Sequence, residues 1–335
     1  MFSKRIGIDL GTANMLVYLG GQGVVLNEPT VVAVRADTNQ VVAVGLEAKD
    51  MLGRTPGNIV ASRPLKDGVI ADYQVTQSML EYFIQKVSGK SRLIKPEVMV
   101  CIPSGITQVE KRAVLDATHA AGARAVYLIE EPLAAAIGAK IPIAQASGHM
   151  ILDSGGGTTD VAVISLGGIV NHASVRVGGD ALQEAMVNYV RKKFGILIGE
   201  RSSEDMKIKL GNAIPSESSE KKMEIRGRDS VSGLPRQEEI TEGQVFEGIE
   251  PILKKIISAI REVFEKTPPE LSSDIIEKGI VLTGGTMLLR NIDKYITRET
   301  GVPAYVAEDP LYCVVRGTGV AIENLELYKR SINKK

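Results

Sequence analysis

The sequence predicts an α/β protein with two similar domains that face one shared ligand. The first observation is a repeated turn, at residues 6–14 and again at 151–160, in which an apolar run ends on an aspartate and then turns on glycine and threonine. The second is the length of 335 residues, which exceeds one ordinary hydrophobic core. The third is the alternation of strand-like and helix-like segments that follows, which is typical of an α/β sheet. Two such turns predict two domain halves that close on one polyphosphate.

The composition restricts the classes of function. Apolar residues make up 44% and charged residues 24%, as in globular proteins. Basic and acidic residues balance at 40 each and tryptophan is absent, so no nucleic-acid partner is expected. No apolar run is long enough to span a bilayer and no signal-peptide pattern is present, which predicts a cytoplasmic protein. Cys101 and Cys313 are isolated in the sequence, which predicts two reduced thiols that fill apolar space.

The first half is expected to begin with a β meander. Its short apolar runs alternate with turns and predict strands at residues 6–9, 15–19, 23–26, 30–34 and 41–44. A short helix at 47–52 and the Gly- and Pro-rich stretch up to residue 65 indicate a small insertion. The pattern then alternates, predicting a helix at 75–87, a strand at 98–102, a helix at 107–121, a strand at 125–129 and a helix at 132–139.

The second turn restarts the pattern at Met150. Helices are expected at 180–194, 203–212 and 242–265, after Leu288 and at 310–328, with a strand at 280–282 and small strands within the charged stretch 213–240. The expected organisation is a first domain at 1–142, with an insertion at about 33–65, and a second domain at 143–310, with an insertion at about 180–250. Residues 311–335 are expected to pack back on the first domain.

The repeated turns supply the chemistry of a nucleotide site. Asp9 and Asp153 end their strands beside the turns, where carboxylates can hold Mg²⁺ through water while the ion bridges phosphate oxygens. Glycines at 11 and 155–157 let backbone N–H groups approach phosphate. The alternative is that Asp-x-Gly is only favourable turn chemistry. The repetition and a third glycine turn at 282–286 favour the nucleotide, although no P-loop sequence is present.

Two other features have two interpretations each. Glu131 stands where a strand meets a helix, and it could activate the water that attacks a γ-phosphate or simply be the acidic residue that helix N-termini favour. Glu204 and Lys207 lie three apart on one helix face, as a surface ion pair or as a clamp on a ribose. For both features the residues alone favour the structural alternative.

A third feature is the loop at 90–96, in which Leu93 and Ile94 lie among three basic residues. The apolar pair could enter an anionic membrane, with the cations at the headgroups. It could equally belong to an ordinary connection with both side chains turned inward, which the residues alone favour.

Nearly the whole chain resembles the actin-like ATPase superfamily and, within it, the MreB family of bacterial actin homologues. The matching runs include IDLGTAN at 8–14, LNEPTVVAV at 26–34, AVGLEAKDMLGRTPG at 43–57, RPLKDGVIADY at 63–73, IEEPLAAAIGA at 129–139, SVRVGGD at 174–180, IGER at 198–201, KTPPEL at 266–271 and GIVLTGG at 279–285. The resemblance implies an actin-like (ribonuclease H-like) ATPase fold, with ATP and Mg²⁺ in a cleft between two domains that each carry a small subdomain. It also implies a homopolymer of paired protofilaments on the inner face of the cytoplasmic membrane. There it would act with cell-wall elongation and shape proteins to keep cells rod-shaped.

The resemblance assigns site residues by position. It implies that the phosphates are held by Thr12, Ala13, Asn14, Gly156, Gly157 and Thr158. It implies that the nucleoside is contacted by Glu204, Asp205, Met206, Lys207, Gly284, Gly285, Thr286 and Met287. Glu131 would position the hydrolytic water with help from Thr158, and Leu93 and Ile94 would contact the membrane. These roles reverse the interpretations that the residues alone favour.

The chain departs from the family pattern in three places. Ser154 and Asp160 flank the second glycine turn where the family has Ile and Glu, and Asp160 is one methylene shorter than that glutamate. Thr286 stands where a further glycine is common. Only Met1–Arg5 precede the first expected strand, so no amphipathic N-terminal membrane helix is expected.

Two other functions of the same superfamily are alternatives. A sugar kinase fits the chain length, but no aspartate base directed at a sugar hydroxyl can be identified. The ATPase half of a chaperone would also carry an aspartate at position 160, but no peptide-binding domain follows in this sequence.

Overall fold

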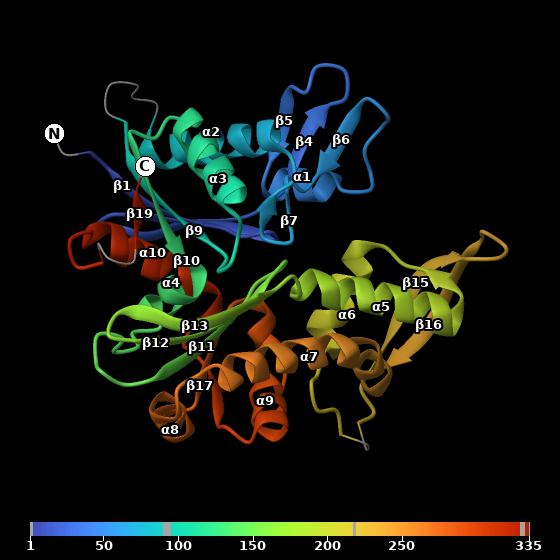
Figure 1. The fold of residues 1–335 in the computed structure, drawn as a ribbon. Coiled ribbons are helices and arrows are strands. Elements are labelled where there is room, and N and C mark those ends of the chain that lie inside the picture. The colour runs from blue at the N-terminus through green and yellow to red at the C-terminus, as the bar shows by residue number, and fades with distance from the viewer. Residues whose placement is uncertain (1–2, 90–94, 217–218, 329–331, 335) are drawn as a thin grey trace.

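Two mixed sheets with the same topology form the two halves of the molecule (Figure 1). The computed structural model describes residues 3–89, 95–216, 219–328 and 332–334. In each sheet three antiparallel strands are followed by two strands parallel to the first. The first sheet contains β1 (Arg5–Leu10), β2 (Asn14–Leu19), β3 (Gly23–Pro29), β9 (Glu97–Ile102) and β10 (Ala125–Glu130). The second contains β11 (His149–Ser154), β12 (Thr159–Ser165), β13 (Gly168–Val175), β17 (Ile280–Thr283) and β18 (Ala304–Val306). The repeated turn thus joins the first two strands of a repeated sheet.

The last two strands of the expected meander, at 30–34 and 41–44, do not continue the first sheet. β4 (Val32–Arg35) and β5 (Val41–Val44) leave the first sheet and form a separate three-stranded sheet with β6 (Ile59–Ser62). The reason is that both faces of β4 are covered. Val32 and Val34 face the large core, whereas Ala33 packs with Ala43 and Ala48 in a small core of its own. α1 (Leu46–Met51) contributes Ala48 to that small core.

Two predicted helices cover the first sheet. α2 (Tyr73–Ser88) begins where the Asp72 carboxylate accepts a hydrogen bond from the Val75 amide at 3.0 Å. α3 (Gln108–Ala120) begins at a capping box between Thr107 and Glu110. Before α2, the short strands β7 (Leu65–Lys66) and β8 (Val69–Ile70) form a tight hairpin that reaches the phosphate turns, as described below.

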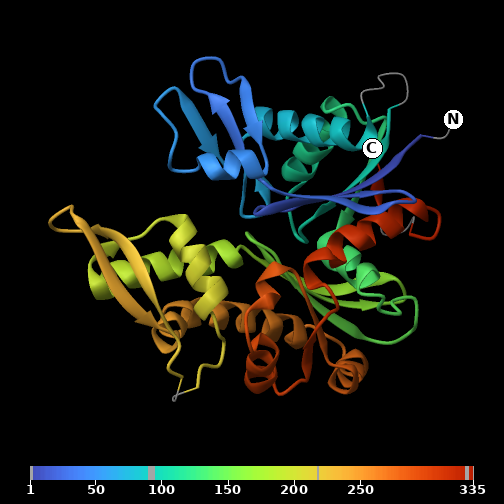
Figure 2. The same cartoon turned by 180° about the vertical axis from the view of Figure 1, so that it is seen from behind.

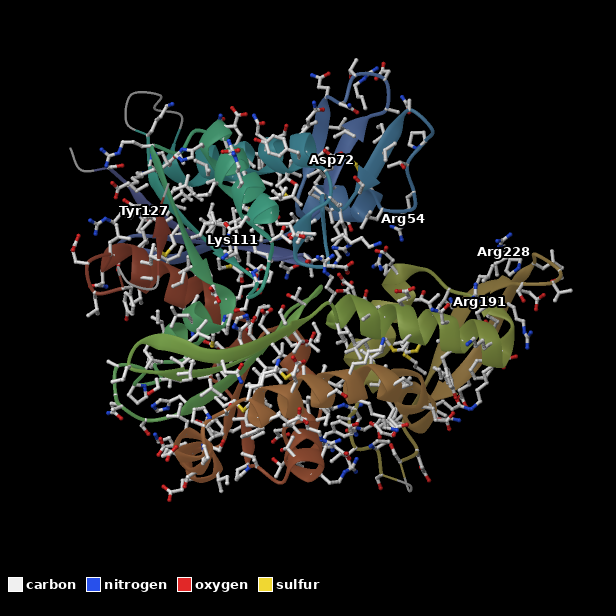
Figure 3. The ribbon with its side chains drawn as sticks, viewed as in Figure 1. Arg54, Asp72, Lys111, Tyr127, Arg191 and Arg228 are labelled. Atoms are coloured by element: carbon white, nitrogen blue, oxygen red, sulfur yellow. The ribbon has the colours of Figure 1, made fainter. Side chains whose placement is uncertain are left out.

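The second half carries a second small sheet. It is formed by β14 (Ile196–Leu197), β15 (Lys222–Asp229) and β16 (Pro235–Thr241). The helices of this half are α5 (Gly179–Phe194), α6 (Glu200–Leu210), α7 (Glu242–Glu265), α8 (Pro269–Lys278) and α9 (Ile292–Thr300). Figure 3 shows Arg191 and Arg228 at the outer end of this half, far from the paired sheets. α8 was not predicted from the sequence, and its ten residues carry only Leu271, Ile275 and Ile276 as large apolar side chains.

Two helices lie between the sheets (Figure 2). α4 (Glu131–Gly138) and α10 (Cys313–Glu323) pack against each other, and their apolar side chains join those of both sheets in one cluster. The C-terminal segment also adds the short strand β19 (Asn333–Lys334) to the edge of β10. α4 and α10 contact both halves, so their contacts do not assign them to one domain. The domain boundaries expected after residues 142 and 310 therefore stay predictions. Within the described residues no helix has the length and apolarity to cross a bilayer.

Candidate nucleotide site

The two glycine turns meet at the base of a cavity of about 470 Å³. Their contact requires glycine. A Cβ on Gly156 would lie 2.7 Å from the Ala13 Cβ, and one on Gly157 would lie 2.5 Å from the Thr12 Oγ1. The β7–β8 hairpin closes the same corner, since the Gly68 amide donates to the Thr12 hydroxyl at 3.0 Å. The two turns are therefore in direct contact, as expected if both turns hold the same phosphate chain.

Most of the predicted site residues line this cavity. Those on its wall are Asp9, Thr12, Ala13, Asn14, Glu131, Asp153, Gly156, Gly157, Thr158, Glu204, Lys207, Gly284, Gly285 and Thr286. Three others are not on the wall: Asp205, Met206 and Met287.

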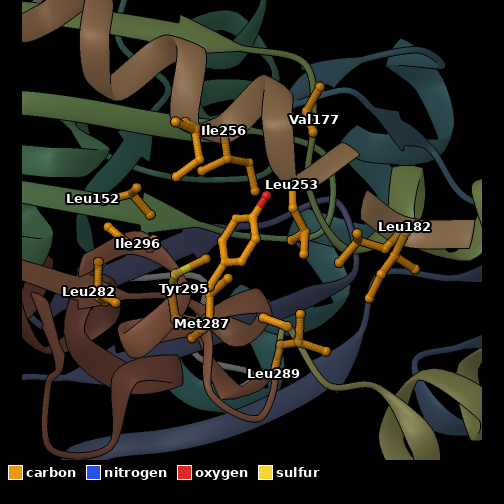
Figure 4. Close-up of a cluster of buried hydrophobic side chains, with 14 of the residues drawn as sticks. Leu152, Val177, Leu182, Leu253, Ile256, Leu282, Met287, Leu289, Tyr295 and Ile296 are labelled. Atoms are coloured by element: carbon orange, nitrogen blue, oxygen red, sulfur yellow. The ribbon is translucent and has the colours of Figure 1, made fainter. Parts of the chain in front are cut away.

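Met206 and Met287 are buried in the apolar core of the second half instead. Figure 4 shows Met287 beside Tyr295 in this core. Both methionines therefore support the wall from behind, and their side chains do not face the cavity. The predicted membrane residues Leu93 and Ile94 lie outside the described residues.

The acidic groups at the base of the cavity are buried close together. Burial and the neighbouring Asp153 carboxylate raise the pKa of Asp9 to about 7. Burial raises the pKa of Asp153 to about 6, although Thr283 donates a hydrogen bond to it at 2.7 Å. Carboxylates held this close without a cation repel each other, and hard oxygen ligands suit Mg²⁺. Among the described residues no group of three metal-ligating side chains occurs, so this pair fits an ion held mainly by water and phosphate oxygens.

Glu131 lies at the first turn of α4 beside this pair. Its side chain is buried, and burial together with the charges of Asp160, Asp153 and Asp9 raises its pKa well above the usual range. A buried carboxyl with a raised pKa at the edge of a phosphate site has the properties of a general base.

The carboxyl cluster makes stability depend on pH. In the unfolded chain an aspartate has a pKa of 3.8, whereas in the folded protein the values are about 7 for Asp9 and about 6 for Asp153. A raised pKa in the folded state stabilises the protein below the unfolded value, and this contribution is lost as the pH rises through the folded value. The ligand-free protein is therefore expected to lose several kcal/mol of unfolding free energy between about pH 5 and pH 7, at about 1.4 kcal/mol per pKa unit. Thermal unfolding followed by circular dichroism measures this loss.

A matched variant separates the cluster from other groups. Asp153→Asn removes one of the paired charges and should flatten the pH profile in this window. Glu110 and Asp274, whose pKa values are lowered, act at lower pH. Burial lowers the pKa of His149 from 6.5, so this group acts within the window with the opposite sign, but equally in the wild type and the variant. A melting temperature that stays constant or rises from pH 5 to pH 7 would contradict the assignment.

The outer end of the cavity carries charges from both halves. Lys49 on α1 pairs with Glu204 on α6 at 3.2 Å, and Arg63 pairs with Glu200 at 3.7 Å, so ion pairs cross the mouth of the cavity. These pairs are partly exposed, which limits each to roughly 0–1 kcal/mol. Burial lowers the pKa of Lys207, whose ammonium group lies on the cavity wall.

The residue-level prediction missed several wall residues: Lys49, Arg63, Gly68, Asp180 and Gln183. Four of them, all but Gln183, lie within the family-like runs at 43–57, 63–73 and 174–180. Those runs are the one signal in the sequence that could have placed them at the site.

Comparisons with known proteins agree with this geometry. The family model described as MreB/Mbl protein matches residues 3–330. The chain belongs to the MreB/Mbl family. It is 53% identical to the cell shape-determining protein MreB of Escherichia coli K12 over 333 residues, which covers 98% of this chain and 96% of that protein. It is similar to the crystal structure of MreB5 of Spiroplasma citri bound to AMPPNP, with a TM-score of 0.92, 39% identity and coverage of 98% and 99%.

Membership of the MreB/Mbl family confirms the predicted actin-like fold. The structure of the MamK double helical filament has the same fold, with a TM-score of 0.81 and 20% sequence identity. The match covers 96% of this chain and 99% of that chain. The family also decides against the sugar kinase, since the relatives that cover the chain are cell shape-determining proteins.

Three residues that depart from the MreB/Mbl pattern make hydrogen bonds near the site. The Asp160 carboxylate is buried and accepts a hydrogen bond from the Ser104 amide at 2.8 Å, so the shorter side chain still links the second turn to the first half. The Ser154 hydroxyl lies 2.7 Å from that of Thr159 inside the sheet. The Thr286 hydroxyl donates to the Gly155 carbonyl at 2.7 Å, which ties the third glycine turn to the second.

Proposed function

We propose that this protein is a cytoskeletal ATPase that polymerises into actin-like filaments on the inner face of the cytoplasmic membrane and maintains cell shape by organising cell-wall synthesis. The contact between the two glycine turns at the base of one cavity carries the proposal, because only a ligand with several phosphates needs both turns. The MreB/Mbl relatives with the same fold, one of them bound to AMPPNP, support ATP as that ligand.

The chain's own groups can perform each part of the reaction. The backbone N–H groups of the turns at Gly11–Asn14 and Gly155–Thr158 hold the phosphates. Asp9 and Asp153 would hold Mg²⁺, and the ion would supply positive charge to the phosphate oxygens. Glu131 accepts the proton of the attacking water, and the Thr158 hydroxyl orients that water. Lys207 and Glu204 contact the nucleoside at the outer end.

Cleft closure connects hydrolysis to assembly. The triphosphate touches both halves and therefore favours the arrangement in which the two turns stay together. Loss of the terminal phosphate removes part of this contact, and the halves are then free to separate about α4 and α10. In this scheme hydrolysis limits the lifetime of the filament.

Sedimentation tests the function directly. Purified protein with ATP and Mg²⁺ is expected to pellet above a critical concentration and to release phosphate, whereas the same protein with ADP stays largely in the supernatant. A protein that remains monomeric with ATP at all concentrations would refute the polymer. A protein that polymerises but transfers phosphate to a sugar would refute the ATPase.

The membrane part of the proposal rests on the sequence of the loop that contains Leu93 and Ile94. Cosedimentation with vesicles of anionic lipid tests it. The variant with serine at both positions should lose vesicle binding and still polymerise, and retained binding would place the membrane contact elsewhere.

A further inference from the structure

Arg290 joins two walls of the nucleotide cavity that are far apart in the sequence. Its guanidinium Nε donates to the Gly211 carbonyl at 3.0 Å, and its Nη2 donates to the Lys209 carbonyl at 3.3 Å. Both carbonyls belong to the C-terminal end of α6, whose orphan carbonyl groups carry partial negative charge. One arginine therefore caps the helix that carries Glu204 and Lys207.

The same side chain is fixed from its other side by α7. Its Nη2 lies 2.7 Å from an oxygen of Glu242, whose side chain is only 3% exposed. A carboxylate this deeply buried needs a cationic partner. The guanidinium therefore donates its hydrogen bonds to the helix end, while its charge faces the Glu242 carboxylate.

Backbone and amide contacts continue the junction. The Ala213 amide donates to the Arg290 carbonyl at 2.8 Å, and the Asn291 side chain donates to that of Asn212 at 2.8 Å. Leu289, directly before Arg290, lies on the cavity wall and packs on Gly211, where a Cβ would come within 2.7 Å of it. The segment after the third glycine turn is thereby held against the end of α6.

We propose that Arg290 is a positioning residue for the nucleoside: it sets the spacing between α6 and the third glycine turn, and does not itself contact the ligand. This inference rests on the proposed nucleotide function. The phosphate turns belong to other elements, so the residue should affect the nucleoside part of the affinity and leave the triphosphate part unchanged.

Calorimetric titration with ATP and with inorganic tripolyphosphate, both with Mg²⁺, separates these parts. The test variant combines Arg290→Met with Glu242→Gln, so that no buried charge is left without a partner. Its matched control is Glu242→Gln alone, which keeps the arginine at the end of α6. The double variant should bind ATP about tenfold more weakly than the control, because α6 and its nucleoside contacts are displaced, with tripolyphosphate affinity equal in both.

The outcomes are distinct. Equal ATP affinity in the double variant and its control would overturn the inference, as would a parallel loss for ATP and tripolyphosphate. If the double variant does not fold, Arg290→Lys decides, because it keeps the charge near Glu242 and loses the paired donors; a selective loss of about threefold for ATP is expected. Equal affinities there would also overturn it. A wild-type protein that binds neither ligand would refute the proposed function itself.

Discussion

Glu131→Ala is expected to bind ATP with wild-type affinity and to hydrolyse it on the order of 10²- to 10⁴-fold more slowly, the usual contribution of a general base. The carboxyl lies on the cavity wall, outside both phosphate turns, so its removal leaves the binding groups in place. Phosphate release under single-turnover conditions measures the rate, and fluorescence titration with an ATP analogue measures the affinity.

Glu130 offers the matched control for this variant. It precedes Glu131 in the sequence, but its carboxylate accepts a hydrogen bond from the Ser104 hydroxyl at 2.9 Å and is not part of the cavity wall. Glu130→Ala should therefore hydrolyse ATP at close to the wild-type rate. Equal rates in wild type and Glu131→Ala would remove Glu131 from the catalytic role.

The pH dependence gives a second signature of the same role. Burial and the surrounding carboxylates raise the pKa of Glu131, and only the ionised form can accept a proton. The wild-type rate should therefore rise with pH through this raised pKa. Glu131→Gln keeps the shape of the side chain but cannot ionise, so its residual rate should lack that rise.

The fold was predictable where local pattern and repetition coincide. The strands expected on either side of the first turn, at 6–9 and 15–19, agree with β1 and β2 within a few residues, and the repeated turn lies between β11 and β12 in the same way. The insertion expected at about 33–65 covers most of β4 and all of β5, but their pairing with β6 in a separate sheet was not predictable in this way. It depends on the small core around Ala33 and Ala48, which exists only once α1 has folded against it.

The site was predictable only in part, for a related reason. Glycine and aspartate at a turn indicate a phosphate site because the chemistry is local to the turn. Lys49 and Arg290 act through partners 155 and 79 positions away, Glu204 and Gly211, and no spacing in the sequence records such contacts. The third glycine turn shows both limits. Gly284 and Gly285 line the cavity as the pattern suggests, whereas the neighbouring Met287 turns into the core.

Gly317→Ala is expected to have the largest effect on stability. Gly317 on α10 faces α4 with no space between the backbones, and a Cβ there would lie 1.7 Å from the Ala134 carbonyl oxygen. The contact is reciprocal, since a Cβ on Gly138 would lie 1.8 Å from the Cys313 carbonyl oxygen. Neither obstacle is a flexible side chain, so the helices must move apart. Overpacking usually costs about 1–3 kcal/mol, and the backbone clash should place this variant at or above the upper end.

The same change should reach the nucleotide site. α4 carries Glu131 at its start, and Val314 of α10 lies on the cavity wall, so separating the helices displaces both. Urea unfolding should show the loss of stability, and ATP hydrolysis should fall with it even in the folded fraction.

Gly243→Ala is the matched control: this glycine lies in α7 with no atom within 4 Å of the added Cβ. A helical alanine there should leave stability unchanged or raise it by up to about 1 kcal/mol. If Gly317→Ala were as stable and as active as Gly243→Ala, the close backbone contact between α4 and α10 would not be needed for stability or for the geometry of the cavity.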